Sequence, residues 1–326
     1  MRAPDFWRRG GGFLGGALAP LGWGYGLGTR IRFALARPGK CPVPVLCVGN
    51  VVAGGAGKTP VALSLGERLM EQGRKVHFLS RGFGGTQAGP LAVDPATHTV
   101  RDVGDEALLL AAQAPAWVAT DRLAGARAAA QGADAVIMDD GFQNPAVAKD
   151  LSFLVVDGRY GFGNGRMIPA GPLREPVADA LGRADALVVM GDDEAGVGNQ
   201  PAVQAQGLPV LKAQVRPGPL VGELKGGPVI AFAGIADPEK FFATLENAGF
   251  DLNARHVFPD HHPYSPQDIQ ELKAKAGEMK ASLVTTAKDA ARLSSQDLEG
   301  IKVLTISVEW ADEALLDEVL RPLFDD

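Results

Sequence analysis

Cysteine and histidine are scarce in this chain, and their scarcity excludes two kinds of site. The 326 residues contain two cysteines, Cys41 and Cys47, and five histidines. A disulfide-rich scaffold needs several cysteine pairs, and a zinc site needs several ligands at short spacings. Neither pattern occurs in the sequence. We therefore expect both cysteines to be small, buried hydrophobic residues of a protein from a reducing compartment.

Basic residues are outnumbered by acidic ones outside the N-terminus, which argues against a nucleic-acid surface. The net charge is −6, but residues 1–40 hold seven basic residues and one acidic residue, a balance of +6. Subtracting +6 from −6 leaves −12 for the rest of the chain. An acidic body repels nucleic acid, whereas a basic N-terminus is attracted to anionic lipid. The sequence therefore predicts a membrane surface, and no nucleic acid, as a partner.

Charged residues are absent from residues 10–29, a stretch long enough to span a bilayer. Nine glycines and Pro20 within it weaken a spanning helix. Its apolar residues follow a helical spacing, and Trp7, Trp23 and Tyr25 suit a membrane interface. We expect an amphipathic anchor at the interface, with a single span or an ordinary packed helical hairpin as alternatives.

Short apolar runs alternate with helical patterns after Pro44, and no internal repeat is visible. Strands that alternate with helices form a parallel sheet covered on both faces, so we predict an α/β fold. A Gly- and Pro-rich stretch at 209–228 indicates a linker, and a second, shorter alternation follows. The predicted strands are 45–48, 76–79, 117–119, 135–138, 153–156 and 187–190 before the linker, and 229–233, 253–258, 282–286 and 302–307 after it.

These patterns divide the chain into three parts. We predict an N-terminal membrane-associating segment at 1–40, a core domain at 41–215 and a smaller C-terminal α/β domain at 216–326. Ligands of open α/β sheets bind outside the carboxyl ends of the strands. We therefore expect the active site in the cleft between the two domains.

The segment GNVVAGGAGKTP, residues 49–60, looks like a phosphate-binding loop that lacks one glycine. The usual pattern has a glycine five residues before Gly57, where this chain has Val52. The segment nevertheless follows a predicted buried strand and precedes a predicted helix, which is where a phosphate site belongs. The residues that would surround the phosphates with backbone N–H groups are Gly54, Gly55, Ala56 and Gly57.

Lys58 and Thr59 follow this loop and carry the side-chain chemistry. A lysine here reaches the β- and γ-phosphates, and the hydroxyl of the next residue ligates Mg²⁺. We predict that the core is a P-loop NTPase-like sheet that binds ATP and Mg²⁺. The alternative is a chance turn in a glycine-rich chain.

Two acids end the apolar run VIMDDGFQ, residues 136–143. Asp139 and Asp140 stand where the second half of a phosphate site holds Mg²⁺, directly or through water. An Asp-Gly sequence also forms ordinary turns. The phosphate loop about eighty residues earlier favours the metal site.

Three further segments are polar where a fold alone would not need it. SRGFGG places Arg81 after a strand, GDEALLLA begins a helix with Asp105 and Glu106, and PAGPLREP holds Arg174 and Glu175 between prolines. An arginine near a triphosphate neutralises developing charge, and a carboxylate can take a proton from an attacking hydroxyl. The acids of GDEALLLA also suit a helix N-terminus without any catalytic role.

Two of the five histidines lie together in FPDHHPYS, residues 258–265. His261 could orient or assist a carboxylate base across the cleft. Alternatively, Asp260 and His261 form only a helix-capping turn. The sequence leaves both interpretations open.

Together these segments resemble the tetraacyldisaccharide 4'-kinase family, the lipid A 4'-kinases of bacteria with an outer membrane. The matching segments occur in family order over nearly the whole chain; they are PVPVLCVGNVVAGGAGKTPV, SRGFGG, VGDEALLLA, DDGFQ, IPAGPLREP, FPDHH and TTAKDAARL. The resemblance implies transfer of the ATP γ-phosphate to the 4'-hydroxyl of an acylated glucosamine disaccharide 1-phosphate. It also implies two α/β/α domains at the cytoplasmic face of the inner membrane.

The resemblance assigns roles to individual residues. Asp105 matches the proposed catalytic base and His261 the histidine that assists it. The positions that match the phosphate loop, the acidic motif and the polar surroundings are Lys58, Thr59, Asp139, Asp140, Arg81, Arg122, Gln143, Arg174 and Glu175. Phe83 departs from the family's common Tyr, Ala56 from Thr, Ser or Asn, and Ala287 from Glu, which puts fine contacts in question and not the reaction.

Two other functions compete with this one. A membrane-surface ATPase switch often carries K-G-G-x-G-K-[ST], but Ala53 replaces the first lysine, and the N-K-x-D motif of GTPases is missing. A kinase of a soluble metabolite, with a merely packed N-terminus, is the second alternative. Protein partners are not predicted by any segment.

Overall fold

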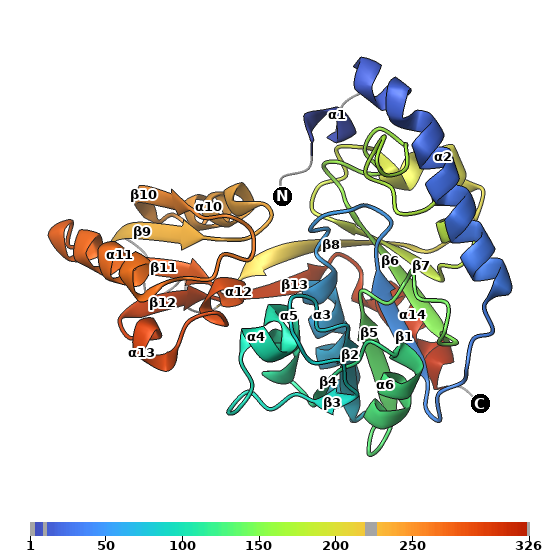
Figure 1. Cartoon of the computed structure of the whole chain (residues 1–326), viewed down its shortest axis with the longest axis horizontal. Coiled ribbons are helices and arrows are strands. Elements are labelled where there is room, and N and C mark those ends of the chain that lie inside the picture. Colours follow the sequence, from blue (N-terminus) through green and yellow to red (C-terminus); the bar gives the residue numbers. More distant parts are fainter. Residues whose placement is uncertain (1–3, 9–11, 219–226, 325–326) are drawn as a thin grey trace.

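The computed structural model describes residues 4–8, 12–218 and 227–324, which form a large unit and a small unit side by side (Figure 1). The small unit contains the second run of strands and helices, and a helix from the N-terminal segment lies along the large unit. Arg2, Arg9 and part of the predicted linker lie outside the described residues.

The large unit is built on a nine-stranded sheet in the order β13-β8-β7-β6-β1-β5-β2-β4-β3. The pairs from β8 through to β4 are parallel, and β13 and β3 are antiparallel edge strands. The strands are β1 (Val45–Gly49), β2 (Val76–Ser80), β3 (Leu91–Ala92), β4 (Ala116–Val118), β5 (Ala135–Asp139), β6 (Leu151–Asp157), β7 (Ala186–Met190), β8 (Val210–Pro217) and β13 (Ile306–Trp310).

Helices cover both faces of this sheet, because successive strand residues point to opposite sides. In β1, Leu46 and Val48 enter one buried cluster, whereas Val45 and Cys47 enter the other. The first cluster includes side chains of α3 (Lys58–Glu71), α5 (Asp105–Ala111) and α14 (Glu313–Leu320); the second includes α6 (Arg122–Ala129), α7 (Val177–Leu181) and α8 (Pro201–Gln204). The predicted α/β class and parallel sheet are confirmed.

The small unit is a four-stranded parallel sheet in the order β10-β9-β11-β12. Buried apolar residues of α10 cover one face and those of α11 the other. Its elements are β9 (Pro228–Ala233), α10 (Pro238–Asn247), β10 (Asp251–Val257), α11 (Pro266–Glu278), β11 (Ser282–Thr286), α12 (Ala287–Ala290), α13 (Ser295–Leu298) and β12 (Ile301–Leu304).

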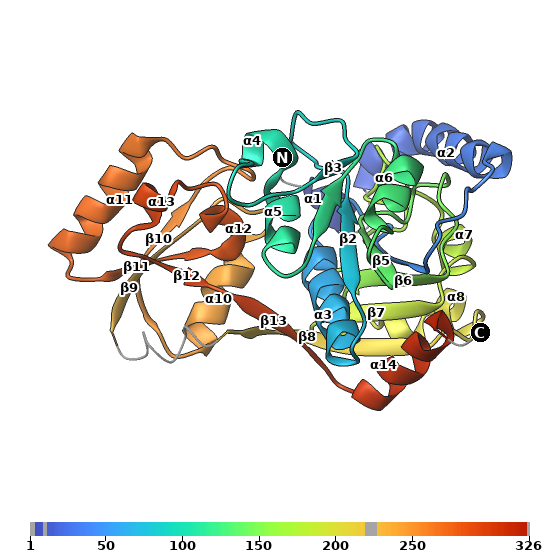
Figure 2. The same cartoon turned by 90° about the horizontal axis from the view of Figure 1, so that it is seen from below.

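Two strands join the units, and they differ from the prediction. The expected linker at 209–228 is partly the strand β8, and the expected single strand at 302–307 is two strands in different sheets, β12 and β13. β13 pairs with β8, and α14 after it packs on the large unit (Figure 2). Asp317 of α14 accepts hydrogen bonds there from Arg68 of α3. The predicted domain 216–326 therefore does not describe one compact unit, because its last strand and helix return to the large sheet.

The N-terminal segment contains α1 (Asp5–Arg8) and α2 (Gly12–Leu35), and Pro20 lies inside α2. Gly15, Gly22 and Gly26 form the buried face of α2 against the large unit. Large apolar side chains of α2 are exposed instead: Phe13, Leu14, Leu21, Trp23, Tyr25, Leu27, Ile31 and Leu35. Among the described residues, no helix is both long enough and apolar enough to cross a membrane.

Candidate active site

The phosphate loop lies between the carboxyl end of β1 and the start of α3, as predicted. Gly57 directly precedes α3 with a φ of 88°, a left-handed conformation that a side chain disfavours. Gly54 has a φ of 130°, and the Asn50 side chain donates to the carbonyl of Val52 at 2.6 Å. The loop is thus shaped by Gly54, Gly57 and Asn50, without a glycine at position 52.

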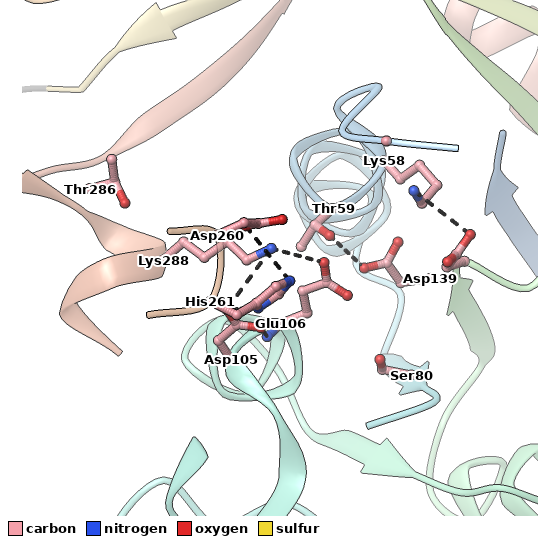
Figure 3. A network of polar contacts seen from close by, with 12 residues as sticks. Lys58, Thr59, Ser80, Asp105, Glu106, Asp139, Asp260, His261, Thr286 and Lys288 are labelled. Carbon is pink, nitrogen blue, oxygen red and sulfur yellow. Dashed lines mark hydrogen bonds and ion pairs between the residues drawn. The ribbon is translucent and has the colours of Figure 1, made fainter. Parts of the chain in front are cut away.

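Lys58, Thr59 and Asp139 meet at this point (Figure 3). The Thr59 hydroxyl donates to Asp139 Oδ2 at 2.7 Å, and Lys58 Nζ lies 3.7 Å from Asp140 Oδ1. Burial, and then the charge of Glu106, raise the pKa of Asp139. Among the described residues, Asp139 Oδ1 is buried without a hydrogen-bond partner. An unpartnered buried carboxylate oxygen beside a hydroxyl suits a divalent cation.

Two side chains of this site, Thr59 and Asp139, are candidate ligands of a metal ion. In the described part of the chain, no group of three or more His, Cys, Asp or Glu side chains could hold a metal ion. Mg²⁺ usually keeps several waters and is bound through one or two carboxylates together with substrate phosphates. The side chains of Thr59 and Asp139 fit that pattern.

Arginines surround Asp140, whose φ of 52° places a non-glycine residue in the left-handed region. Arg174 Nη1 donates to Asp140 Oδ1 at 3.0 Å. Burial acts to raise the pKa of Asp140, but the charges of Lys58 and Arg174 outweigh it and keep the carboxyl ionised.

Arg122, at the start of α6, is buried, and burial lowers its pKa to about 10. Arg81 is exposed just after β2.

Gln143 and Glu175 belong to the support of this site. Gln143 Nε2 donates to Glu175 Oε1 at 3.0 Å, and Arg183 donates to Glu175 Oε2. Glu175 is buried, and protein donors occupy both of its oxygens. Glu175 therefore holds the side chains of Gln143 and Arg183 in place. Its contact with a metal ion stays a prediction.

Asp105 lies buried at the start of α5 and receives its partners from the small unit. His261 Nδ1 lies 3.0 Å from Asp105 Oδ2, and Arg292 donates to the same oxygen through Nε at 3.1 Å and through Nη2. Lys288 Nζ lies 3.9 Å from it. Burial acts to raise the pKa of Asp105. The hydrogen bond with His261, the charge of Lys288, and the hydrogen bond and charge of Arg292 together outweigh burial and hold the pKa of Asp105 well below its ordinary value.

The two units therefore meet at Asp105 and Glu106. Lys288 also lies 3.2 Å from Glu106 Oε1, which connects the units beside Asp139 (Figure 3). A cavity of about 220 Å³ in the small unit adjoins His261 and is lined by Ile235, Ala236, Pro238, Val257, Phe258, Pro259 and Asp260. The phosphate loop approaches this wall, since a Cβ added at Gly55 would lie 3.9 Å from the Ala236 Cβ.

Sequence reasoning missed two cations of the site, Lys288 and Arg292. Both lie in the segment TTAKDAARL, which follows β11 of the small sheet. A strand that runs directly into a helix with Thr286 as its N-cap was a signal for a binding edge. The resemblance to a family includes this segment but gives no role to Lys288 or Arg292.

Comparison with known proteins identifies the family. The sequence model for "LpxK: Tetraacyldisaccharide-1-P 4'-kinase" matches residues 14–324 of this chain. The chain belongs to this tetraacyldisaccharide 4'-kinase family. A relative of that name from Paramagnetospirillum magneticum is 52% identical over 326 residues, covering 100% of this chain and 98% of the relative. Another from Rhodospirillum centenum is also 52% identical, covering 99% of this chain and 97% of its own length.

A solved structure shares the fold of this tetraacyldisaccharide 4'-kinase family member. It is described as the "apo" form of LpxK from Aquifex aeolicus in complex with ATP. The match has a TM-score of 0.79 and 28% sequence identity, and it covers 96% of this chain and 100% of the other. The resemblance and the kinase class predicted from the sequence are thereby confirmed.

One departure from the tetraacyldisaccharide 4'-kinase pattern now has a location. Phe83, one of the expected departures from the family pattern, lies with its ring centroid 5.7 Å from that of His261 at an angle of 56°. Phe83 therefore makes an aromatic contact with His261 but has no hydroxyl group that could form a hydrogen bond there. Ala56, a second departure, is buried within the phosphate loop.

Proposed function

We propose that this protein transfers the γ-phosphate of ATP to the 4'-hydroxyl of a tetraacyldisaccharide 1-phosphate, an acylated glucosamine disaccharide. The product is the 4'-phosphorylated lipid A precursor. One observation supports this proposal above all: a phosphate loop with its Thr59–Asp139 pair opens beside a carboxylate–histidine pair that is formed across two units. The family of the chain supplies the identity of the acceptor.

The phosphate side has groups for charge and position. Lys58 and Arg174 supply positive charge to the transferring phosphoryl group, with Arg122 and Arg81 around it, and the loop N–H groups around Gly57 hold the β-phosphate. Thr59 and Asp139 would hold Mg²⁺, with Asp140 beside them. When bound, Mg²⁺ neutralises charge on the phosphates.

Asp105 is the proposed general base for the acceptor hydroxyl, assisted by His261. Its depressed pKa makes it a weak base. Phosphoryl transfer nevertheless passes through a loose transition state, in which positioning and electrostatics contribute most of the catalysis. Asp105 therefore orients the hydroxyl first and accepts its proton as the new O–P bond forms and the bond between the γ-phosphorus and the leaving ADP breaks.

The exposed face of α2 supports a membrane surface as the place of reaction. Aromatic and aliphatic side chains, including Phe13 and Trp23, point outward, while glycines face the protein. This arrangement suits insertion at the level of the lipid head groups. In this proposal the acyl chains stay in the cytoplasmic leaflet of the inner membrane while the disaccharide enters the site.

The test is an ATP-dependent phosphorylation assay with the disaccharide 1-phosphate as acceptor. We expect a 4'-phosphorylated product from the wild-type protein. Asp105→Ala should lower kcat about 10³-fold, since a positioned base contributes about 10²–10⁴-fold, and should leave the Kd for ATP nearly unchanged. Equal kcat in the variant would remove Asp105 from the mechanism. ATP binding without product would favour an ATPase switch, and product only from a soluble acceptor would favour a metabolite kinase.

A further inference from the structure

Arg292 reaches the candidate base from the other unit of the molecule. Its guanidinium donates to one oxygen of Asp105, Oδ2, through two nitrogens, Nε at 3.1 Å and Nη2. His261 Nδ1 lies 3.0 Å from the same oxygen. The second oxygen, Oδ1, accepts the backbone N–H of Glu106 at 2.9 Å. A carboxylate oxygen has two lone pairs, so Oδ1 retains one for a further donor.

We infer that Arg292 is a positioning residue for phosphoryl transfer: it fixes Asp105 by Oδ2 and leaves Oδ1 to receive the acceptor hydroxyl. The inference rests on the proposed function, in which Asp105 is the general base.

The small unit holds the guanidinium firmly in this position. Arg292 Nη1 donates to the Gly234 carbonyl at 2.7 Å and to Asp289 Oδ1 at 3.0 Å. Asp289 is itself buried and accepts from Tyr264 Oη at 2.8 Å and from the N–H of Gly234 at 2.9 Å. These contacts hold the Arg292 guanidinium in place independently of Asp105. Little conformational freedom of the Arg292 side chain therefore remains to be lost when the acceptor binds.

Burial distinguishes this pair from the surface ion pairs of the molecule. The side chains of Arg292 and Asp105 are 3% and 2% exposed. Removing one partner of a buried pair leaves an unpaired charge, which is a far larger perturbation than the loss of an exposed pair. The buried guanidinium of Arg292 therefore acts on the carboxylate of Asp105, which it contacts directly.

Four groups set the charge around Asp105: His261, Lys288 and Arg292 from the small unit, and Glu106 beside it on α5. The three small-unit groups lower the pKa of Asp105 against the effect of burial. Loss of the Arg292 charge should therefore raise the pKa of Asp105.

The test uses the full-length protein with ATP and the disaccharide 1-phosphate. Arg292→Gln removes the charge, and Arg292→Lys keeps the charge but cannot bind one oxygen through two nitrogens. We expect kcat to fall about 30-fold in the Gln variant and about 5-fold in the Lys variant, as hydrogen bonds to charged groups suggest. The Kd for ATP should stay unchanged in both variants, because the phosphate loop and α3 belong to the large unit.

A double-mutant cycle with Asp105→Asn separates positioning from stability. If Arg292 acts through Asp105, adding Arg292→Gln to Asp105→Asn should cause no further loss of kcat. Additive losses, or a wild-type kcat for Arg292→Gln, would overturn the inference. Arg292→Lys enters the same cycle if the Gln variant fails to fold.

Two controls distinguish this inference from the proposed function. Arg255→Gln removes an exposed arginine that pairs with Glu246 inside the small unit, and it should leave kcat unchanged. If Asp105→Asn alone keeps full activity, the base assignment fails. If Asp105→Asn is inactive while Arg292→Gln is normal, only the role of Arg292 fails.

Discussion

The phosphate side and the base side of the candidate site are built in different ways. Lys58, Thr59, Asp139 and Arg174 all belong to the large unit and converge at the carboxyl ends of adjacent strands. Asp105 belongs to the large unit too, but its partners His261 and Arg292 come from the small unit. The first side needs one sheet, whereas the second exists only where the two units touch.

Under the proposed function, this difference separates the handling of the two substrates. We expect the phosphate side to bind nucleotide with residues of the large unit alone. Asp105 has its partners His261, Lys288 and Arg292 only when the units are together, so we expect the acceptor hydroxyl to need that arrangement. Variants that affect one side and spare the other test this separation.

The largest expected effect comes from Lys58→Ala. Losing one donor aimed at developing charge lowers kcat by about 10²–10³-fold. Losing hydrogen bonds of a charged group should also weaken ATP binding by about 10- to 100-fold. Calorimetric titration with ATP, beside the phosphorylation assay, measures both. Asp105→Ala, with its ATP affinity retained, is the matched contrast. Equal loss of ATP affinity in the two variants would contradict the separation.

The exposed face of α2 should affect only the lipid acceptor. Trp23 is 69% exposed, and combining Phe13→Asp with Trp23→Asp removes two large apolar side chains from this face. Recovery on vesicles containing anionic lipid should fall at least about tenfold, with ATP affinity unchanged. Met279→Asp is the control, because Met279 is an exposed apolar residue of the small unit. Undiminished recovery of the double variant would remove α2 from the lipid surface.

The smallest effects come from two glycines of α2 that differ in their surroundings. A Cβ at Gly22 would lie 2.9 Å from the Met167 carbonyl oxygen, whereas no described atom lies within 4 Å of one at Gly24. Gly22→Ala should destabilise the fold by about 1–3 kcal/mol, and Gly24→Ala should stabilise it by up to about 1 kcal/mol. Met167 belongs to the segment that leads to Arg174, so Gly22→Ala should disturb the phosphate side. Thermal unfolding measures both; similar Tm shifts would refute the contact.

The phosphate side could be predicted from the sequence because its signals are local. A buried strand, a glycine turn, a Lys-Thr pair and a helix follow one another within residues 45–71. Asp139 and Asp140 were predictable because adjacent parallel strands end at one edge of the sheet. The missing glycine at Val52 did not mislead, since Gly54 and Gly57 carry the required backbone angles.

The base side was only partly predictable because its contacts are distant in sequence. Arg292 and Asp105 are 187 positions apart, and no periodicity relates them. The placing of residues 306–326 in the smaller domain differs from the sheet topology for a similar reason: β13 pairs with a strand about ninety residues earlier, and such pairing leaves no local pattern. Conversely, the helix α2 formed despite its glycines, because those glycines allow close packing against the large unit.

The pairing of β8 with β13 makes the small unit an insertion within a hairpin. Pro217 and Ile306 face each other in antiparallel register, so the chain leaves the large sheet and returns to it at neighbouring points. Everything between them is, in topology, one very long hairpin connection. Its two ends therefore enter and leave the large sheet side by side, and taking the small unit out would leave the order of the large sheet's strands unchanged.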